Sequence, residues 1–186
     1  MNSIVKIRKL CLASMFLSLG WLLPFFSGQL QNVGNMLCPM HIPVMMCGFV
    51  LGPFYGLIIG FITPLTRTLL FGMPLLYPIS ICMAFELATY GLICGLLYKI
   101  FIKKFSNLTS TYLSLIISIV VGRIVWGVSR LFCGIVSSNK FTWSLFMSGA
   151  FINAWIGIII QLILLPFLMD VLHSSKFLNK FKEKEE

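Results

Sequence analysis

The chain has 186 residues, of which 59% are hydrophobic and only 10% are charged, and its mean hydropathy is +0.98. About a quarter of an ordinary soluble sequence is charged, so this composition excludes a soluble domain and indicates a multi-span membrane protein. The net charge of +9 does not indicate nucleic-acid binding, because the basic residues cluster at the ends of apolar segments, as they do in cytoplasmic loops.

The first predicted helix, residues 10–26, follows a basic start that contains Lys6, Arg8 and Lys9. The basic start and the apolar run resemble a signal peptide, but no A-x-A-like cleavage site follows and further apolar segments come after it. We therefore expect a retained first span that enters from the cytoplasm. The segment 27–41 that follows it is polar and carries no charge apart from its histidine.

A short second helix is predicted at 42–51, and the glycine-bearing stretch 52–56 is predicted to be a turn. A third helix continues to residue 71 and should be kinked or broken at Pro64, because proline removes a backbone donor inside a helix. A further turn is expected at 72–78.

The remaining predicted helices are 79–101, 112–134 and 147–172, and a charged tail, 175–186, follows them. Each is about 20 residues or longer, which is the length needed to cross the hydrocarbon core of a bilayer. The polar segment 106–111 is predicted to be a loop.

The distribution of lysine predicts the orientation of these helices. Lys99, Lys103 and Lys104 lie at the end of the fourth helix, and four more lysines lie in the tail, whereas the loops expected on the other side hold only Lys140. Positively charged loops stay in the cytoplasm. We therefore expect an all-α integral membrane protein with six transmembrane helices, both termini cytoplasmic, and a single domain over residues 1–186.

Two opposite charges are predicted near the middle of the membrane. A helix rises about 1.5 Å per residue, so Glu86 in the fourth helix and Arg123 in the fifth reach a similar depth. An isolated charge at that depth costs several kcal/mol, and we expect the two side chains to form a structural ion pair. Direct contact of this pair with a ligand is the alternative.

Two further arginines, Arg67 and Arg130, are predicted at the outer level of the membrane, where the sequence places no acidic residue. They could extend to lipid headgroups or bond to carbonyl groups at helix ends. Alternatively, cations without a counter-charge could form a site for an anionic ligand, with a carboxylate held by two hydrogen bonds.

Other polar and aromatic residues could complete such a site. Asn153 and Gln161 lie on the sixth predicted helix, and Trp126 lies three residues after Arg123. His41 borders the long outer segment, where it could line a pocket or simply face water. Amides and aromatic rings suit a small organic ligand, although each residue could equally serve helix packing.

No catalytic or metal-binding motif stands out. The six cysteines are scattered without a C-x-x-C pair, so we expect neither a metal site nor a disulfide framework. Without a Walker A motif the chain could not power transport through ATP by itself. The first helix carries Ser14 and Ser18 on one face beside Ala13, and small residues at this spacing allow another helix to approach closely.

Several blocks together resemble one family. They are "HIPVMMCGFVLGPFYGLIIGFITPLTRTLLFGMP" (41–74), "AFELATYGLICGLLY" (84–98), "GRIVWG" (122–127) and "GAFINAWIGIIIQLILLPFL" (149–168). With the basic start, the small residues of the first helix and the long outer loop, they resemble the substrate-binding S components of energy-coupling-factor (ECF) vitamin transporters. The resemblance covers nearly the whole chain.

The resemblance implies a non-catalytic prokaryotic cytoplasmic-membrane subunit that captures a vitamin-like ligand on the outer side. It would work with a transmembrane coupling subunit and two cytoplasmic ATPases. The implied gate lies around residues 29–40, and the implied docking stripe is Ala13, Ser14 and Ser18. The implied pocket residues are Tyr90, Trp126, Arg130, Asn153 and Trp143.

The unmatched arginines favour an anionic ligand, and pantothenate is our first expectation within this resemblance, without excluding riboflavin, a pyrimidine precursor or queuine-like bases. A thiamine-type cation fits less well, because Glu86 is expected to pair with Arg123. Two other classes stay open: a stand-alone membrane facilitator, and a membrane enzyme or assembly factor. An enzyme should show an acid or histidine pair at one depth, and copurification with a coupling module would separate the facilitator from the ECF subunit.

Overall fold

The computed structural model describes residues 3–27, 37–136 and 154–175 of the chain. Within these ranges the secondary structure is helical, joined by short turns. The elements are α1 (Ser3–Leu22), the 3-10 helix η1 (Leu23–Ser27), α3 (His41–Leu51), α4 (Pro53–Phe71), the short π-helical segment η2 (Leu76–Ser80), α5 (Ile81–Phe101), α6 (Asn107–Val136) and α8 (Trp155–Ser174).

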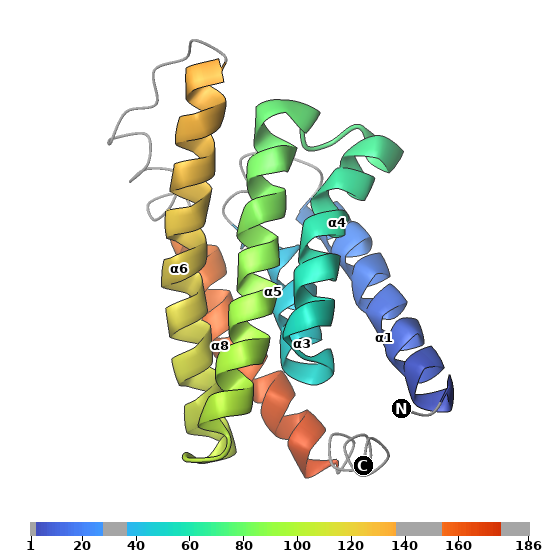
Figure 1. The fold of residues 1–186 in the computed structure, drawn as a ribbon, viewed down its shortest axis with the longest axis vertical. Coiled ribbons are helices and arrows are strands. Elements are labelled where there is room, and N and C mark those ends of the chain that lie inside the picture. Colours follow the sequence, from blue (N-terminus) through green and yellow to red (C-terminus); the bar gives the residue numbers. More distant parts are fainter. Residues whose placement is uncertain (1–2, 28–36, 137–153, 176–186) are drawn as a thin grey trace.

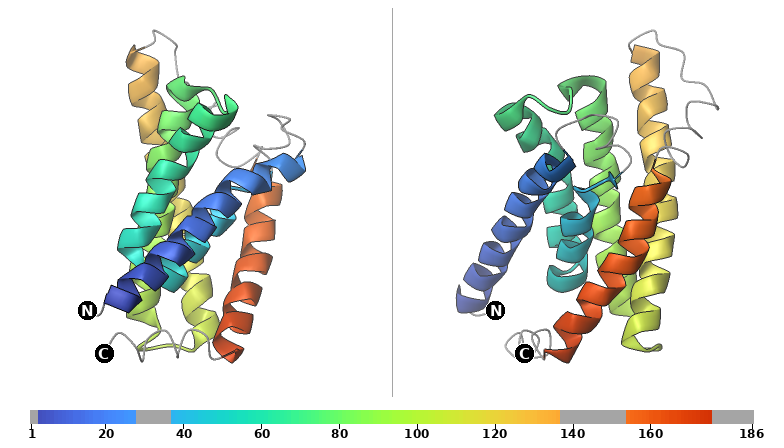
Figure 2. Two further views of the ribbon diagram at one scale, coloured as in Figure 1. Left: turned by 90° about the vertical axis from the view of Figure 1, so that its right-hand side faces the viewer. Right: turned by 180° about the vertical axis from the view of Figure 1, so that it is seen from behind.

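The helices form one bundle in which α5 is central (Figure 1). Helix α5 packs against α4 on one side and α6 on the other, and the short α3 lies against α4 and α5. Helix α1 crosses α3 and α4 obliquely, and α8 packs on α6 and α3 (Figure 2). The start of α1, the turn between α5 and α6, and the end of α8 all lie at the same end of the bundle.

Among the described residues, five helices are long and apolar enough to cross a membrane. They are Val5–Phe26, Pro53–Phe71, Leu76–Phe101, Asn107–Gly134 and Trp155–Ser174. A further apolar helix, α3, has only 11 residues. These residues rise about 16 Å, which is about half of a ~30 Å hydrocarbon core. Six complete crossings are therefore not confirmed, because α3 is too short to be a full span.

Several predicted helix boundaries were wrong. The stretch 52–56 is not a turn, because Gly52 alone links α3 to α4 and Pro53 starts α4, a position that suits the fixed φ of proline. Gly52 has φ +97°, a conformation that favours glycine. Of the two alternatives at Pro64, a break is excluded, because Pro64 lies inside the continuous α4, and a kink stays a prediction.

The polar segment 106–111 is also not a loop, because α6 begins at Asn107. The Ser106 hydroxyl accepts a bond from the backbone N–H of Thr109 at 3.4 Å, as an N-cap residue does. Helix α1 begins at Ser3 rather than at residue 10, since lysine and arginine are good helix formers. The short second helix, predicted at 42–51, is confirmed to within one residue.

Glycine allows α3, α4 and α5 to pack backbone against backbone. A Cβ on Gly91 would overlap the Gly56 carbonyl, and one on Gly48 would overlap the Gly91 carbonyl. Real side chains at these positions would force the three helices apart. This close approach places the second half of α3, at Gly48, directly against the middle of α5, at Gly91.

The basic residues of the described chain concentrate at the end of the bundle where α1 starts. Lys6, Arg8 and Lys9 lie in the first turns of α1, and Lys103 and Lys104 lie in the turn after α5. We call this the basic end, and the end where α6 finishes the opposite end. The start of the sixth predicted helix and the tail 176–186 lie outside the described residues.

Candidate functional site

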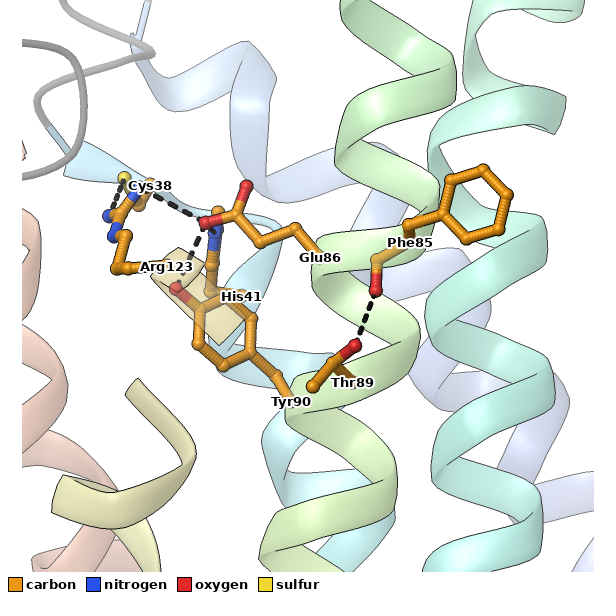
Figure 3. A network of polar contacts seen from close by, with 7 residues as sticks. All are labelled: Cys38, His41, Phe85, Glu86, Thr89, Tyr90 and Arg123. Carbon is orange, nitrogen blue, oxygen red and sulfur yellow. Dashed lines mark hydrogen bonds and ion pairs between the residues drawn. The ribbon is translucent and has the colours of Figure 1, made fainter. Parts of the chain in front are cut away.

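A cluster of buried polar side chains surrounds one oxygen of Glu86 in the interior of the bundle (Figure 3). Arg123 of α6 donates from Nη1 to Glu86 Oε1 at 3.0 Å. Tyr90 donates its hydroxyl to the same oxygen at 2.9 Å, and His41 Nε2 lies 3.6 Å from it. Because these groups come from α3, α5 and α6, the cluster joins three helices at one level.

The chain segment just before α3 also takes part in this cluster. Arg123 Nη2 donates to Cys38 Sγ at 3.7 Å, and Cys38 is buried. Its φ of +47° is the left-handed conformation, which a residue other than glycine seldom adopts. The entry of the chain into α3 is thereby tied to the same arginine that neutralises Glu86.

The Tyr90 ring fits against α6 because the facing residue there is a glycine, Gly122. A Cβ on Gly122 would overlap the Tyr90 ring at Cε1 and Cδ1. The ring also contacts His41, with centroids 5.1 Å apart. Gly122 immediately precedes Arg123, so one helical turn of α6 supplies both the space for the tyrosine and the cation.

Several buried polar atoms of the cluster have no hydrogen-bond partner among the described residues. They are His41 Nδ1, His41 Nε2 and Arg123 Nε. In Figure 3 the second carboxylate oxygen of Glu86 carries none of the drawn contacts and points away from Arg123 and Tyr90. Unpaired buried polar groups are costly, so the cluster retains hydrogen-bonding capacity that a polar molecule could use.

A second polar level lies on α6 nearer the opposite end of the bundle. The Arg130 guanidinium lies over the Trp126 ring, 5.8 Å from its centroid. Within residues 3–27, 37–136 and 154–175, the buried Arg130 Nε has no hydrogen-bond partner. Arg123 and Arg130 are seven residues apart, nearly two turns, so they share one side of α6. The described residues contain two acids: Glu86 bonds to Arg123, and Asp170 lies near the end of α8 at the basic end.

Arg67 lies elsewhere, near the end of α4. Its Nη1 donates to the Met73 carbonyl at 2.7 Å, and its guanidinium lies 5.7 Å and 5.9 Å from the ring centroids of Phe25 and Phe71. The side chain is buried. Arg67 therefore connects η1, α4 and the following turn. Its bond to a carbonyl at the helix end is one of the two alternatives expected from the sequence, the other being contact with a ligand.

The family model described as "ECF transporter, substrate-specific component" matches residues 8–169. This match covers most of the chain, from the first turns of α1 to the last turns of α8. The chain belongs to the substrate-specific components of ECF transporters. No curated protein and no solved structure matched it.

As a substrate-specific component, the protein is a multi-pass cell-membrane subunit with a small-molecule substrate and the coupling and ATPase partners of ECF transporters. Its expected docking residues on α1 separate into two faces. Ser14 and Ser18 are exposed, whereas Ala13 is buried against the bundle. Ser14 and Ser18 donate to the carbonyls of Cys11 and Ser14 at 2.8 Å and 2.9 Å, so their outer surface is compact.

The structure groups the predicted site residues of this ECF component differently from the sequence. His41 and Tyr90, expected at the ligand, join the predicted ion pair of Glu86 and Arg123 in one cluster. Trp126 and Arg130 form the second level. The expected pocket residues Asn153 and Trp143 lie outside the described residues, as does most of the expected gate.

Sequence reasoning missed Cys38 and the packing role of Gly122. Cys38 lies between helices, where no periodic pattern places it. Gly122 carries a weak signal, since it flanks a membrane arginine, but a glycine is common in apolar helices. The position of Tyr90 one turn after Glu86 did carry a usable signal, because residues four apart lie on one helix face.

Proposed function

We propose that this ECF substrate-specific component captures an anionic micronutrient at the opposite end of the bundle, which faces the outside of the cell. The captured molecule, with pantothenate as the first candidate, then passes through a transmembrane coupling subunit driven by two ATPases. The basic end supports this orientation, because positively charged ends stay in the cytoplasm. Both termini are then cytoplasmic, and α3 acts as the incomplete second of six membrane helices.

The observation that carries the proposal is the state of Arg130. Its guanidinium lies over Trp126. In the described part of the chain, its buried Nε has no hydrogen-bond partner and neither acid is available to it. A charged group within a membrane protein requires a counter-charge or hydrogen bonds. A carboxylate from the substrate meets that requirement, because a guanidinium binds a carboxylate through two parallel bonds.

The Glu86 cluster supports the uncharged part of the same substrate. Arg123 neutralises Glu86, so the cluster favours neutral polar groups over a second ion. His41 Nδ1 and Arg123 Nε offer unfilled hydrogen-bonding positions. Pantothenate combines a carboxylate with hydroxyl and amide groups, which matches an arginine at one level and a neutral polar cluster at the next.

The test is a titration of the purified protein with pantothenate, for the wild type and for Arg130→Gln. We expect Arg130→Gln to weaken binding about 10-fold or more, since a hydrogen bond to a charged group contributes roughly 1.5–3 kcal/mol. Arg8→Gln is the matched control, because Arg8 is an exposed arginine at the basic end and should leave affinity unchanged.

Native mass spectrometry of the purified protein identifies the carried ligand independently. A copurified ligand without any acidic group would overturn the anionic assignment. Uptake that continues without the ATPase partners would favour the stand-alone facilitator.

A further inference from the structure

Two thiols approach each other across the interface of α5 and α6, at the end of the bundle opposite the lysines. Cys82 Sγ lies 3.4 Å from Cys133 Sγ. Cys82 is in the first turn of α5 and is fully buried, whereas Cys133 is in the last turn of α6 and is half-buried. A disulfide bond is about 2.05 Å long, so a movement of roughly 1.4 Å between the sulfur atoms would bring them to bonding distance.

The neighbourhood of this thiol pair holds the two helices in register. The Tyr77 hydroxyl donates to the Cys133 carbonyl at 2.7 Å, which fixes the segment before α5 onto the end of α6. Arg130 precedes Cys133 by one helical turn. Cys94, twelve residues further along α5, shows a different arrangement, since its thiol bonds to the Ser118 hydroxyl at 2.9 Å.

We propose that Cys82 and Cys133 are a redox-active dithiol that forms a reversible disulfide between α5 and α6 beside Arg130. The oxidant is a low-molecular-weight disulfide. Disulfides persist in oxidising surroundings such as the outside of a cell, and the outer position of the pair rests on the orientation given under Proposed function. The contact between the thiols does not depend on that orientation.

The exchange proceeds in two steps. The Cys133 thiol, which is the more accessible, loses its proton, and its thiolate attacks one sulfur of the small disulfide. The disulfide bond of the oxidant breaks, and the departing thiolate takes up a proton. The Cys82 thiol then loses its proton, and its sulfur attacks the Cys133 sulfur of this mixed disulfide and forms the bond between the helices. The second small thiolate departs and takes up that proton. Two protein thiols are oxidised and one oxidant disulfide is reduced to two thiols.

Such a bond would constrain the two helices at the level of Arg130. It closes a covalent loop between positions 82 and 133, and a loop of this length removes conformational freedom from the unfolded chain. The redox state of the surroundings would thereby set how far α5 and α6 can separate next to the proposed anion site.

The test uses the full chain purified in detergent without added ligand. The protein is incubated with oxidised glutathione, its remaining thiols are alkylated under denaturing conditions, and its intact mass and proteolytic peptides are measured. We expect a peptide containing Cys82 to be linked to one containing Cys133, so that these two of the six thiols escape alkylation together, whereas the exposed Cys11 can only add glutathione. Dithiothreitol should restore all six.

Three variants make the assignment specific. Cys82→Ala should stop at a glutathione adduct on Cys133, because the second thiol is missing. Cys133→Ala should leave Cys82 unmodified, since Cys82 is inaccessible to the oxidant. Cys94→Ala removes a thiol from the same helix interface and should still form the link.

The absence of a link between Cys82 and Cys133 in the oxidised wild type, or a link that joins other cysteines instead, would overturn the proposal. The measurement needs no substrate, so a failed pantothenate titration leaves this result standing, and the absence of a link leaves the proposed function standing.

Discussion

Arg123 of α6 donates to Glu86 of α5 at 3.0 Å, in a site where their side chains are only 5% and 2% exposed. Each charge is buried inside a bundle of apolar helices. Each residue therefore depends on the other, since either buried charge alone would have no counter-charge.

Glu86→Gln should strongly destabilise the fold, because it leaves the buried Arg123 charge without its partner. Breaking a buried pair by removing one member costs about 3–5 kcal/mol. Thermal unfolding in detergent should show a large fall in melting temperature for this variant. Asp170→Asn, which removes an exposed acid on α8, is the control and should melt like the wild type.

The double variant Glu86→Gln with Arg123→Gln separates the interaction between the two charges from the cost of replacing each charge by itself. It should be less destabilised than the sum of the two single variants, as expected for residues in direct contact. Strictly additive losses would mean that the two charges are stabilised independently of each other.

Tyr90 depends on the absence of a side chain at position 122. Gly122→Ala should displace the Tyr90 ring and weaken its bond to Glu86, at a cost of about 1–3 kcal/mol for overpacking. Gly91→Ala should be more harmful, because its Cβ meets the backbone of Gly56, which cannot rotate away. The melting temperature should be highest for the wild type, lower for Gly122→Ala and lowest for Gly91→Ala.

Tyr90→Phe is the matched comparison for this series, because it removes the hydroxyl and keeps the ring. It should cost less than Gly122→Ala, about 0.5–1.5 kcal/mol. If Gly122→Ala melts like the wild type, then the Tyr90 ring does not depend on the absence of a side chain at position 122.

The depth of charged residues was predictable from the sequence, whereas the way in which α3 reaches them was not. A fixed rise per residue places Glu86 and Arg123 at one level, and the structure brings them into contact. The same arithmetic says nothing of Cys38, which lies before α3 in an unusual backbone conformation. It also does not show that His41, at the first residue of α3, lies inside the bundle rather than at its surface.

Helix boundaries were predicted least well where polar residues serve as helix ends. Ser106 and Thr109 have the composition of a loop, but they cap α6 and begin its first turn. Pro53 follows a glycine and so resembles a turn residue, but it starts α4. In both places one residue type suits a turn and a helix start equally, and only the surrounding packing decides between them.

Arg67 should act as an anchor for the end of α4 rather than as a contact for the ligand. Arg67→Gln loses the bond to the Met73 carbonyl and the positions beside Phe25 and Phe71. We expect it to lower stability by about 1.5–3 kcal/mol, the contribution of a hydrogen bond from a charged group, while the Kd for pantothenate stays within about 2-fold of the wild type. The reverse pattern, weakened binding at unchanged melting temperature, would assign Arg67 to the ligand.

Ser14→Trp should abolish ATP-driven uptake and leave ligand binding intact. Ser14 is exposed on the face of α1 that points away from the bundle, and its hydroxyl is already bonded within the helix. An indole there adds bulk to a surface on which small residues would let a coupling-subunit helix approach closely. Because the change lies outside the packed core, the melting temperature of the isolated subunit should not fall.

The control for this change is Ile163→Trp, which places the same indole on an exposed position of α8, where uptake should continue at the wild-type rate. Uptake in proteoliposomes that contain the coupling subunit and ATPases, measured beside the pantothenate titration, separates transport from binding. If Ser14→Trp transports normally, the face of α1 that carries Ser14 and Ser18 is not the docking surface. If both tryptophan variants lose uptake, added bulk anywhere on the membrane-facing surface is harmful, and the loss would not be specific to α1.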